Sequence, residues 1–205
     1  LFELFRYEQP DGIAADGMGF SHQYLGQTFY EILPENRVVY TNTNIDVMSN
    51  QDGFYYTLHI QSVESNEKRS ITLPYEPVEI TDDPAADFRE MAANPEADDR
   101  SRARYNKLID AIEERIQSIQ FKPPLQWLTA DRQYIFGFTY TQNEKDEVLT
   151  NVIDADTGEH ISSLFMSFPY AVIKNGFAYK INDYRTLETF PKIEKYRIDP
   201  RVYGK

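Results

Sequence analysis

The sequence of 205 residues contains no cysteine. This absence excludes disulfide bonds, catalytic thiolates, and zinc or iron–sulfur sites that depend on cysteine. Basic residues are also few, because 21 lysines and arginines stand against 33 aspartates and glutamates, which gives a formal net charge of −12. We therefore expect no nucleic-acid partner, since binding to phosphates relies on lysine and arginine.

Long apolar runs are missing as well. No segment approaches the roughly 18 apolar residues of a membrane span, so we expect no direct insertion into a membrane. The negative charge also disfavours adhesion to an anionic membrane surface. The first residue is Leu1 rather than methionine, and no signal-peptide pattern follows it, which favours a mature or truncated product.

Aromatic residues, in contrast, are abundant. They make up 14% of the chain, led by 15 tyrosines and 13 phenylalanines, and hydrophobic residues together make up 41%. Enrichment in aromatic residues favours strands that pack on one another. The composition therefore predicts a globular, strand-rich chain that is long enough for a substantial core.

Short strands separated by polar turns form two similar groups. The first group is predicted at residues 27–33, 37–43, 44–49 and 54–60. The second group follows residue 124, at residues 125–130, 133–141, 147–154 and 159–166. Each group is typical of a four-stranded antiparallel meander. The turns NQDG (50–53) and ADTG (155–158) occupy matching places, so the two groups indicate a weak internal repeat.

The segment DADTGE (154–159) also resembles the start of a calcium-binding loop. An EF-hand loop needs a bidentate glutamate at its twelfth position, but the twelfth residue counted from Asp154 is Phe165. The matching turn of the first group lacks the paired acidic residues. We therefore interpret the segment as a hairpin turn with Gly158 in the left-handed conformation, and we predict no metal site.

A third group of strands is shorter. It is predicted at residues 169–174, 177–182 and 191–198, and its Asn175-Gly176 pair is a strong hairpin signal. A fourth strand is absent before the chain ends. The opening residues 1–8 (LFELFRYE) read as an isolated strand, and completing this third group is one use for it.

A helical insertion is predicted at residues 82–122, between the first two groups. A short helix begins near Asp83, which is suited to capping, and a longer helix runs from Asp98 or Asp99 to about Gln120. The longer helix has one apolar face. The residues of this face are Tyr105, Leu108, Ile109, Ile112, Ile116 and Ile119. We expect it to pack on the neighbouring sheets, and a groove for a partner is the alternative.

The four-stranded meanders, the helical insertion and the ending KIEKYRIDPRVYGK (192–205) together resemble a known family. They are similar to the six-bladed β-propeller proteins of Bacteroidetes-type bacteria, of the TolB-like or NHL-like kind, many of which are lipoproteins or secreted. The resemblance covers most of residues 20–203. The fold class that it implies is all-β, with about three propeller blades and a helical insertion.

In this interpretation the chain is one partial propeller domain. Its parts are a strand plus the first blade (1–80), the helical insertion (82–122) and the last blades (125–205). A closed propeller needs roughly four to eight blades. The missing blades are therefore expected from upstream sequence in a longer protein or from another chain.

The resemblance also implies a function. It favours a non-enzymatic binding module of an extracytoplasmic protein, in the periplasm, at the outer membrane or secreted, that recognises a protein, peptide or glycan ligand. One alternative is a hydrolase or lyase with a metal ion in the central channel of the propeller. Another is a structural subunit of an envelope assembly, in which the helical insertion is the docking surface.

The residues themselves indicate no catalytic constellation. The histidines His22, His59 and His160 are scattered, and the glycine-rich segment 11–20 lacks the features of a phosphate-binding loop. We therefore predict no catalytic residue and no cofactor. Several aromatic residues are candidates for a ligand pocket, although about half of them are expected in the core. Among them, Trp127 and Tyr140 are the strongest candidates for ligand binding, since they are large and amphipathic.

Overall fold

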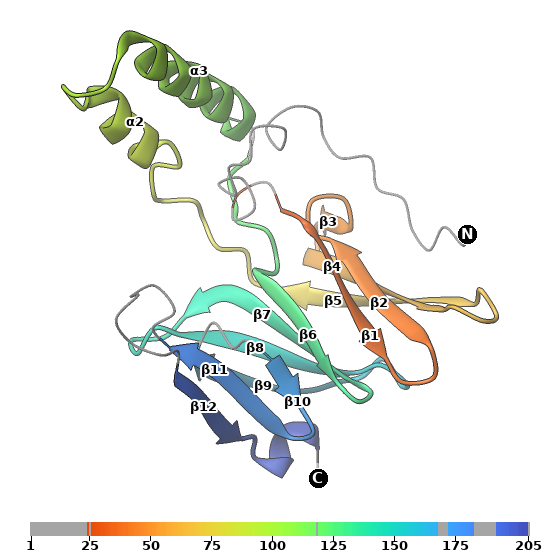
Figure 1. Cartoon of the computed structure of the whole chain (residues 1–205). Coiled ribbons are helices and arrows are strands. Elements are labelled where there is room, and N and C mark those ends of the chain that lie inside the picture. The colour runs from red at the N-terminus through yellow and green to blue at the C-terminus, as the bar shows by residue number, and fades with distance from the viewer. Residues whose placement is uncertain (1–23, 25, 118, 168–171, 183–191, 205) are drawn as a thin grey trace.

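The computed structural model describes residues 24, 26–117, 119–167, 172–182 and 192–204. It consists of three antiparallel sheets and a helical hairpin (Figure 1). The hairpin is inserted between the first and second sheets in sequence. Among the described residues, no helix combines the length and hydropathy that crossing a membrane requires.

The first sheet is built around one long strand. Its strands are β1 (Thr28–Leu33), β2 (Arg37–Asn42), β3 (Val47–Asn50), β4 (Gly53–Ser62) and β5 (Lys68–Tyr75). On one side β4 pairs with β3 and then with β2, so these two short strands share one strand position. On its other side β4 pairs with β5 along its length.

The sequence prediction for this sheet, four strands between residues 27 and 60, is wrong in one respect. Two of those strands share a position, and the outer position is taken by β5, which was not predicted. Only Ile71 and Leu73 of β5 are buried, and the strand begins with three exposed polar residues. This weak alternation explains why the strand was missed.

The second and third sheets agree with the prediction. The second contains β6 (Trp127–Asp131), β7 (Tyr134–Gln142), β8 (Glu147–Asp154) and β9 (His160–Ser167), paired in sequence order. The third contains β10 (Val172–Lys174), β11 (Phe177–Asn182) and β12 (Lys192–Arg197), and a 3-10 turn, η2 (Pro200–Tyr203), follows it. Residues 1–8, proposed as a fourth strand for this sheet, lie outside the described residues.

The three sheets stack face to face around the second one (Figure 1). Alternate residues of a strand point to opposite faces. In β7, Ile135 therefore belongs to the core shared with the first sheet, whereas Tyr134 and Phe136 belong to the core shared with the third. Antiparallel sheets stacked in this way confirm the predicted fold class, an all-β chain of blade-like sheets with a helical insertion.

The helical hairpin contains α2 (Ala86–Ala93) and α3 (Asp99–Ile116). The carboxylate of Asp98 caps α3 by accepting a hydrogen bond from the amide of Ser101, at 2.7 Å. The predicted cap at Asp83 is wrong by two residues. The carboxylate of Asp83 accepts a hydrogen bond from the amide of Ala85, and Ala85 is the N-cap residue of α2.

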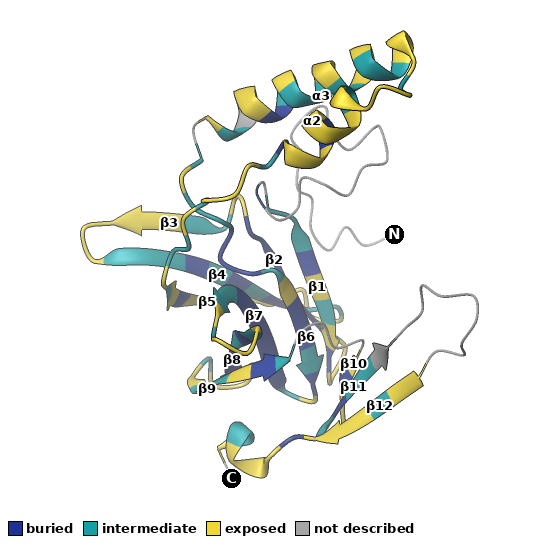
Figure 2. Cartoon of the chain, turned by 90° about the vertical axis from the view of Figure 1, so that its left-hand side faces the viewer, coloured by how far each residue is buried: buried dark blue, intermediate teal, exposed yellow. Residues whose placement is uncertain are grey.

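The expectation that α3 packs on the sheets is also wrong. Its apolar face packs on Ala85 and Phe88 at the start of the hairpin, in a cluster that contains no sheet residue. Figures 1 and 2 show the hairpin standing away from the sheets. The short α2, which the sequence also predicted, covers the face that we assigned to the sheets.

A narrow neck connects the hairpin to the sheets. The chain enters and leaves through two segments joined by a β-bridge between Glu79 and Phe121. The amide of Lys122 donates to the carbonyl of Val78 at 2.8 Å, and that of Ile80 donates to the carbonyl of Gln120 at 3.0 Å. The two ends of the insertion therefore lie side by side.

Candidate functional site

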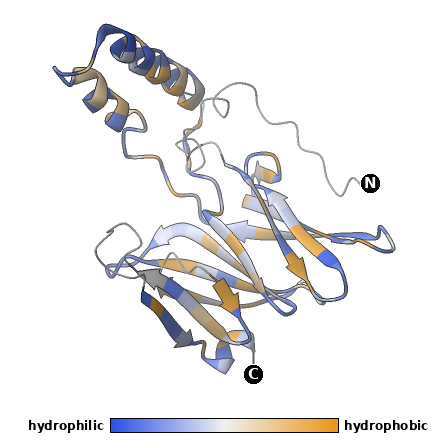
Figure 3. Cartoon of the chain, in the orientation of Figure 1, coloured by the Kyte–Doolittle hydropathy of each residue, from blue (hydrophilic) through white to orange (hydrophobic). Residues whose placement is uncertain are grey.

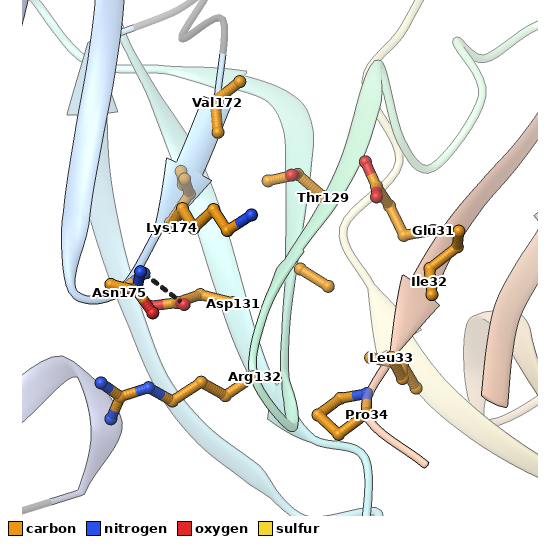
Figure 4. A pocket seen from close by; sticks show the side chains of 12 residues that line it. Glu31, Ile32, Leu33, Pro34, Thr129, Asp131, Arg132, Val172, Lys174 and Asn175 are labelled. Carbon is orange, nitrogen blue, oxygen red and sulfur yellow. Dashed lines mark hydrogen bonds between the residues drawn. The ribbon is translucent and has the colours of Figure 1, made fainter. Parts of the chain in front are cut away.

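The first strands of the three sheets line a common pocket. Strands β1, β6 and β10 each pair with one neighbour among the described strands, so each presents an edge that is not used within its own sheet. A cavity of about 430 Å³ lies between them. Figure 4 shows Glu31 and Ile32 of β1 on one side and Lys174 of β10 on the other, with Thr129 of β6 between them.

One wall of the pocket contains a carboxylate with a structural role. The side chain of Asp131, only 3% exposed, accepts hydrogen bonds from the amides of Asn175 and Gly176, at 2.6 and 2.7 Å. It also accepts one from the hydroxyl of Tyr203, at 2.9 Å. Asp131 therefore fastens the β10–β11 turn and the C-terminal segment to the second sheet. Burial and the neighbouring Asp131 raise the pKa of Tyr203.

Two cations at the pocket are available to a ligand. Lys174 and Arg132 are exposed, and neither forms an ion pair or a side-chain hydrogen bond with another residue in the described ranges. The ammonium group of Lys174 is directed toward the space between β10 and β6 (Figure 4). The whole chain is strongly acidic, so two basic side chains without an ion-pair partner among the described residues are unusual at one pocket.

The opposite wall carries Glu31. Burial raises the pKa of its carboxyl group, and hydrogen bonds from Thr129 and from the backbone at Ile32 only partly offset this effect. The pocket also has Lys174, whose ammonium group is directed into it, and Arg132, whose guanidinium extends the other way (Figure 4), beside apolar atoms of Ile32 and Val172. Such a lining is suited to an acidic group that has an apolar neighbour.

The predicted ligand-binding residues lie elsewhere. Trp127 begins β6, is 41% exposed and packs edge-to-face on Phe29, with ring centroids 6.1 Å apart. Tyr140 lies near the end of β7, where burial raises its pKa to about 12. The ammonium group of Lys122 lies 5.7 Å from the centroid of its ring. Neither predicted residue lines the pocket, and their proposed role in binding stays a prediction.

The acidic turn that resembled a calcium loop is a hairpin turn, as predicted. Asp154 accepts hydrogen bonds from the amides of Asp156 and Thr157, at 2.7 and 3.1 Å, and Gly158 has a φ of +79°. The guanidinium of Arg69 binds the carbonyls of Asp156 and Thr157. This turn of the second sheet is thereby attached to the first sheet. The described part of the chain contains no cluster of three or more potential metal-ligating side chains.

A hydrogen-bonded row of three polar side chains on the first sheet was not predicted. His59 lies between Asp46 and Ser70, with its Nε2 3.1 Å from Asp46 Oδ1 and its Nδ1 3.0 Å from Ser70 Oγ. His59 and Ser70 are direct cross-strand neighbours on β4 and β5. The sequence indicated only scattered histidines, and the missed strand β5 explains why Ser70 was not recognised as a partner of His59. His160 contacts Ser163 at 2.8 Å, and His22 lies outside the described residues.

Comparison with known proteins gives little further information. No family model matches the chain, and no curated protein matches it. Among solved structures, the chain is similar to the β-propeller domain of the Trilobed protease from Pyrococcus furiosus, with 11% identity and a TM-score of 0.26. The match covers 82% of this chain and 55% of that one, so the chain spans about half of its length. The assignment of blade-like sheets rests on the pairing and stacking described above.

Proposed function

We propose that the chain is part of a six-bladed β-propeller of an extracytoplasmic bacterial protein, and that it is a non-enzymatic binding module. The observation that carries this proposal is the common pocket of β1, β6 and β10. In a propeller the first strands of successive blades gather around the axis, where loops and strand edges meet a ligand. The stacking of the three sheets supports this arrangement.

The lining of the pocket supports an acidic peptide as the ligand. Lys174 in the pocket and Arg132 at its edge offer two cations that form no ion pair with the residues that the structure describes, and Ile32 and Val172 offer apolar contacts. The free strand edges add main-chain donors and acceptors for an extended peptide. The overall charge of −12 opposes non-specific binding of acidic peptides, so affinity at this pocket requires local complementarity.

The test is an NMR titration of the chain with a short peptide that alternates glutamate and valine. We expect amide shifts to be largest at β1, β6 and β10. Replacing both cations, with Arg132→Glu and Lys174→Glu, should weaken binding at least about tenfold, because two charge contacts become repulsive. The control Lys68→Glu with Lys145→Glu changes the net charge equally on exposed sites away from the pocket. Equal weakening by both pairs, or shifts elsewhere, would refute this binding site.

We further propose that other blades cover the two ends of the stack, supplied by upstream sequence or by another chain. Large apolar side chains are exposed at both ends. Met48 on the outer side of the first sheet is 51% exposed, and Ile193 on the third sheet is 66% exposed. In a protein that carries all blades, both residues should be protected from hydroxyl-radical labelling relative to this chain. Unchanged labelling would contradict the proposal.

A second candidate function is hydrolysis, and the observation that favours it is the chain Asp46–His59–Ser70. The carboxylate of Asp46 can only accept, so Nε2 of His59 carries its hydrogen and Nδ1 accepts from the hydroxyl of Ser70. This is the proton path of an activated serine, although the two ring nitrogens are exchanged relative to the serine protease arrangement. Ser70 would attack an acyl carbon and pass its proton to His59, which gives it to the leaving group. Water would then attack the acyl ester on Ser70, with His59 accepting the proton of the water and returning a proton to Ser70 as the acid is released.

A fluorophosphonate probe distinguishes this second candidate from the first. Hydrolysis predicts that the probe labels Ser70 on the intact chain, and that His59→Gln abolishes labelling while the fold is kept. Ser65→Ala, a change at an exposed turn, is the matched control. Absence of label at Ser70 in the wild-type chain would exclude an activated serine there.

A further inference from the structure

The wall of the pocket that β10 forms is held in place by few contacts. Figure 3 shows that β10 is mostly hydrophobic, yet only one of its three side chains, Ile173, is buried. Val172 and Lys174 are exposed and line the pocket. Among the described strands β10 pairs with β11 alone. Because Lys174 is the last residue of β10, its position depends strongly on the turn that follows it.

The turn of Asn175 and Gly176 is fastened on two sides. Both residues have positive φ values, +54° and +77°, as the two-residue hairpin between β10 and β11 requires. Both amides donate to the carboxylate of Asp131, which belongs to the second sheet. The carbonyl of Gly176 accepts a hydrogen bond from the amide of Ile198, at 2.9 Å. The turn therefore lies between Asp131 and the C-terminal segment (residues 198–204).

The carboxylate of Asp131 depends on the hydrogen bonds that it receives. It is almost fully buried, and it forms no ion pair with a basic side chain in the described ranges. A buried charge is costly unless hydrogen bonds compensate it. The described donors are the amides of Asn175 and Gly176 and the hydroxyl of Tyr203, and the last two share the oxygen Oδ2. Without the hydroxyl, rotation of the carboxylate toward water becomes more favourable, which weakens its hold on the turn.

Tyr203 is itself placed by the second sheet. Its ring packs edge-on against the rings of Tyr134 and Phe136 on β7, with centroid distances of 4.9 and 5.9 Å. The carbonyl of the preceding Val202 accepts a hydrogen bond from the hydroxyl of Ser162 on β9, at 2.8 Å. These contacts do not involve the strands of the third sheet. They therefore fix the hydroxyl of Tyr203 independently of the turn that it helps to hold.

We propose that Tyr203 is a positioning residue for the pocket. Acting through Asp131, its hydroxyl holds the β10–β11 turn so that the ammonium group of Lys174 is directed into the pocket (Figure 4). The C-terminal segment thereby sets the affinity of a pocket that it does not line. This inference rests on the proposed binding of acidic peptides, and it adds that the strength of binding is controlled from outside the pocket.

Hydrogen exchange tests the first link, from Tyr203 to the turn, without a ligand. Tyr203→Phe removes the hydroxyl and keeps the ring that packs on β7. We expect amide exchange at Asn175 and Gly176, measured by NMR, to accelerate at least about tenfold more than exchange at Phe136. Exchange at Phe136, within β7, reports any loss of stability of the whole stack. Equal acceleration at all three amides would show a purely structural role and would overturn the proposal.

A double-mutant cycle tests the second link, from the turn to Lys174. In the wild-type background, Tyr203→Phe should weaken binding of the peptide that alternates glutamate and valine at least about threefold. In a Lys174→Met background the same change should weaken binding by less than about 1.5-fold, because the group that Tyr203 positions is absent. A role of Tyr203 in stability alone predicts the same factor in both backgrounds, and this result would overturn the proposal.

Tyr196→Phe is the matched control. It removes a tyrosine hydroxyl from β12, where Tyr196 donates to Glu194 and is 44% exposed. It should leave both exchange at the turn and peptide affinity unchanged. Unchanged exchange at Asn175 and Gly176 in Tyr203→Phe would overturn the proposal. A wild-type chain that binds no peptide would instead refute the proposed function, and the hold of Tyr203 on the turn would then be decided by exchange alone.

Discussion

The stack of sheets and the helical hairpin differ in the size of the hydrophobic core that stabilises each of them. The core between the first and second sheets contains thirteen buried residues, whereas the core of the hairpin contains three. Each face of the second sheet is covered by another sheet, so the first six residues of β7 are all buried, and buried residues alternate with half-buried ones along most of β8. The helices, in contrast, cover each other on one side only.

This difference predicts which mutations reduce the stability of the fold most. Side chains between sheets lose many contacts when they are removed, because close-packed interiors relax only partly. Side chains in the hairpin have fewer contacts to lose, and the neck separates them from the sheets. We therefore expect mutations in the two regions to differ in both the size and the extent of their effects.

The largest effect is expected at Phe136, which is 0% exposed between the second and third sheets. Phe136→Ala should lower the free energy of unfolding by about 3–5 kcal/mol, through lost contacts and a cavity. Urea denaturation followed by circular dichroism measures it. Phe165, on the neighbouring β9, is 43% exposed, and Phe165→Ala should cost less than about 1 kcal/mol. Similar losses for both would show that the stack is not the stabilising core.

Asp131 should come next, since it joins two sheets by polar contacts. Asp131→Ala leaves two backbone amides and the hydroxyl of Tyr203 without their acceptor, at a cost of about 2–3 kcal/mol. In Asp131→Asn the pKa of Tyr203 should fall, because the anion that opposes tyrosinate is gone; alkaline absorbance titration measures this. Asp52→Ala, in an exposed turn, is the control. An unchanged pKa of Tyr203 would argue against this contact.

Two glycines in the stack have similar backbone angles but different surroundings, so they compare an open turn with a crowded one. Gly158 and Gly176 have φ values of +79° and +77°, which disfavour any side chain. A Cβ at Gly176 meets nothing within 4 Å, but at Gly158 it meets the guanidinium of Arg69. Gly176→Ala should cost about 1 kcal/mol and Gly158→Ala about 2 kcal/mol, as measured by thermal unfolding. Equal costs would mean that Arg69 moves aside freely.

The smallest effect on the stack is expected from the hairpin. Ile112 is 4% exposed, and Ile112→Asp should open the hairpin because it places a charge in a core of three residues. Hydrogen exchange should accelerate in α2 and α3, while unfolding of the sheets shifts by less than about 0.5 kcal/mol. Asn106→Asp, on the exposed side of α3, is the control. Faster exchange throughout β7 and β8 would show that the regions are coupled.

Much of the sheet structure could be predicted from the sequence. Alternating apolar residues and glycine turns located the second and third sheets, because a turn such as Asn175-Gly176 acts locally. Strand β5 was missed because its two buried residues give a short signal after a charged start. The apolar face of α3 was correctly identified from Tyr105 to Ile116, but the helix ends at Ile116, so Ile119 lies beyond it and the predicted end near Gln120 is wrong. An apolar face also does not show which element covers it.

The candidate site could not be predicted in the same way. Glu31, Asp131 and Lys174 come from three different sheets, and only the stacking of those sheets brings them to one pocket. None of them belongs to a motif with fixed spacing. Aromatic content pointed instead to Trp127 and Tyr140, whose chemistry suits binding but whose positions depend on the same unseen stacking.

The bridge between Glu79 and Phe121 has a consequence for how this chain tolerates variation. The insertion starts and ends at adjacent points of the fold. Its length can therefore change without altering the positions of the sheets. A tight reverse turn placed there would close the gap, and a foreign module with neighbouring ends would fit equally well. Removal or replacement of the insertion should therefore leave the spacing of the sheets unchanged.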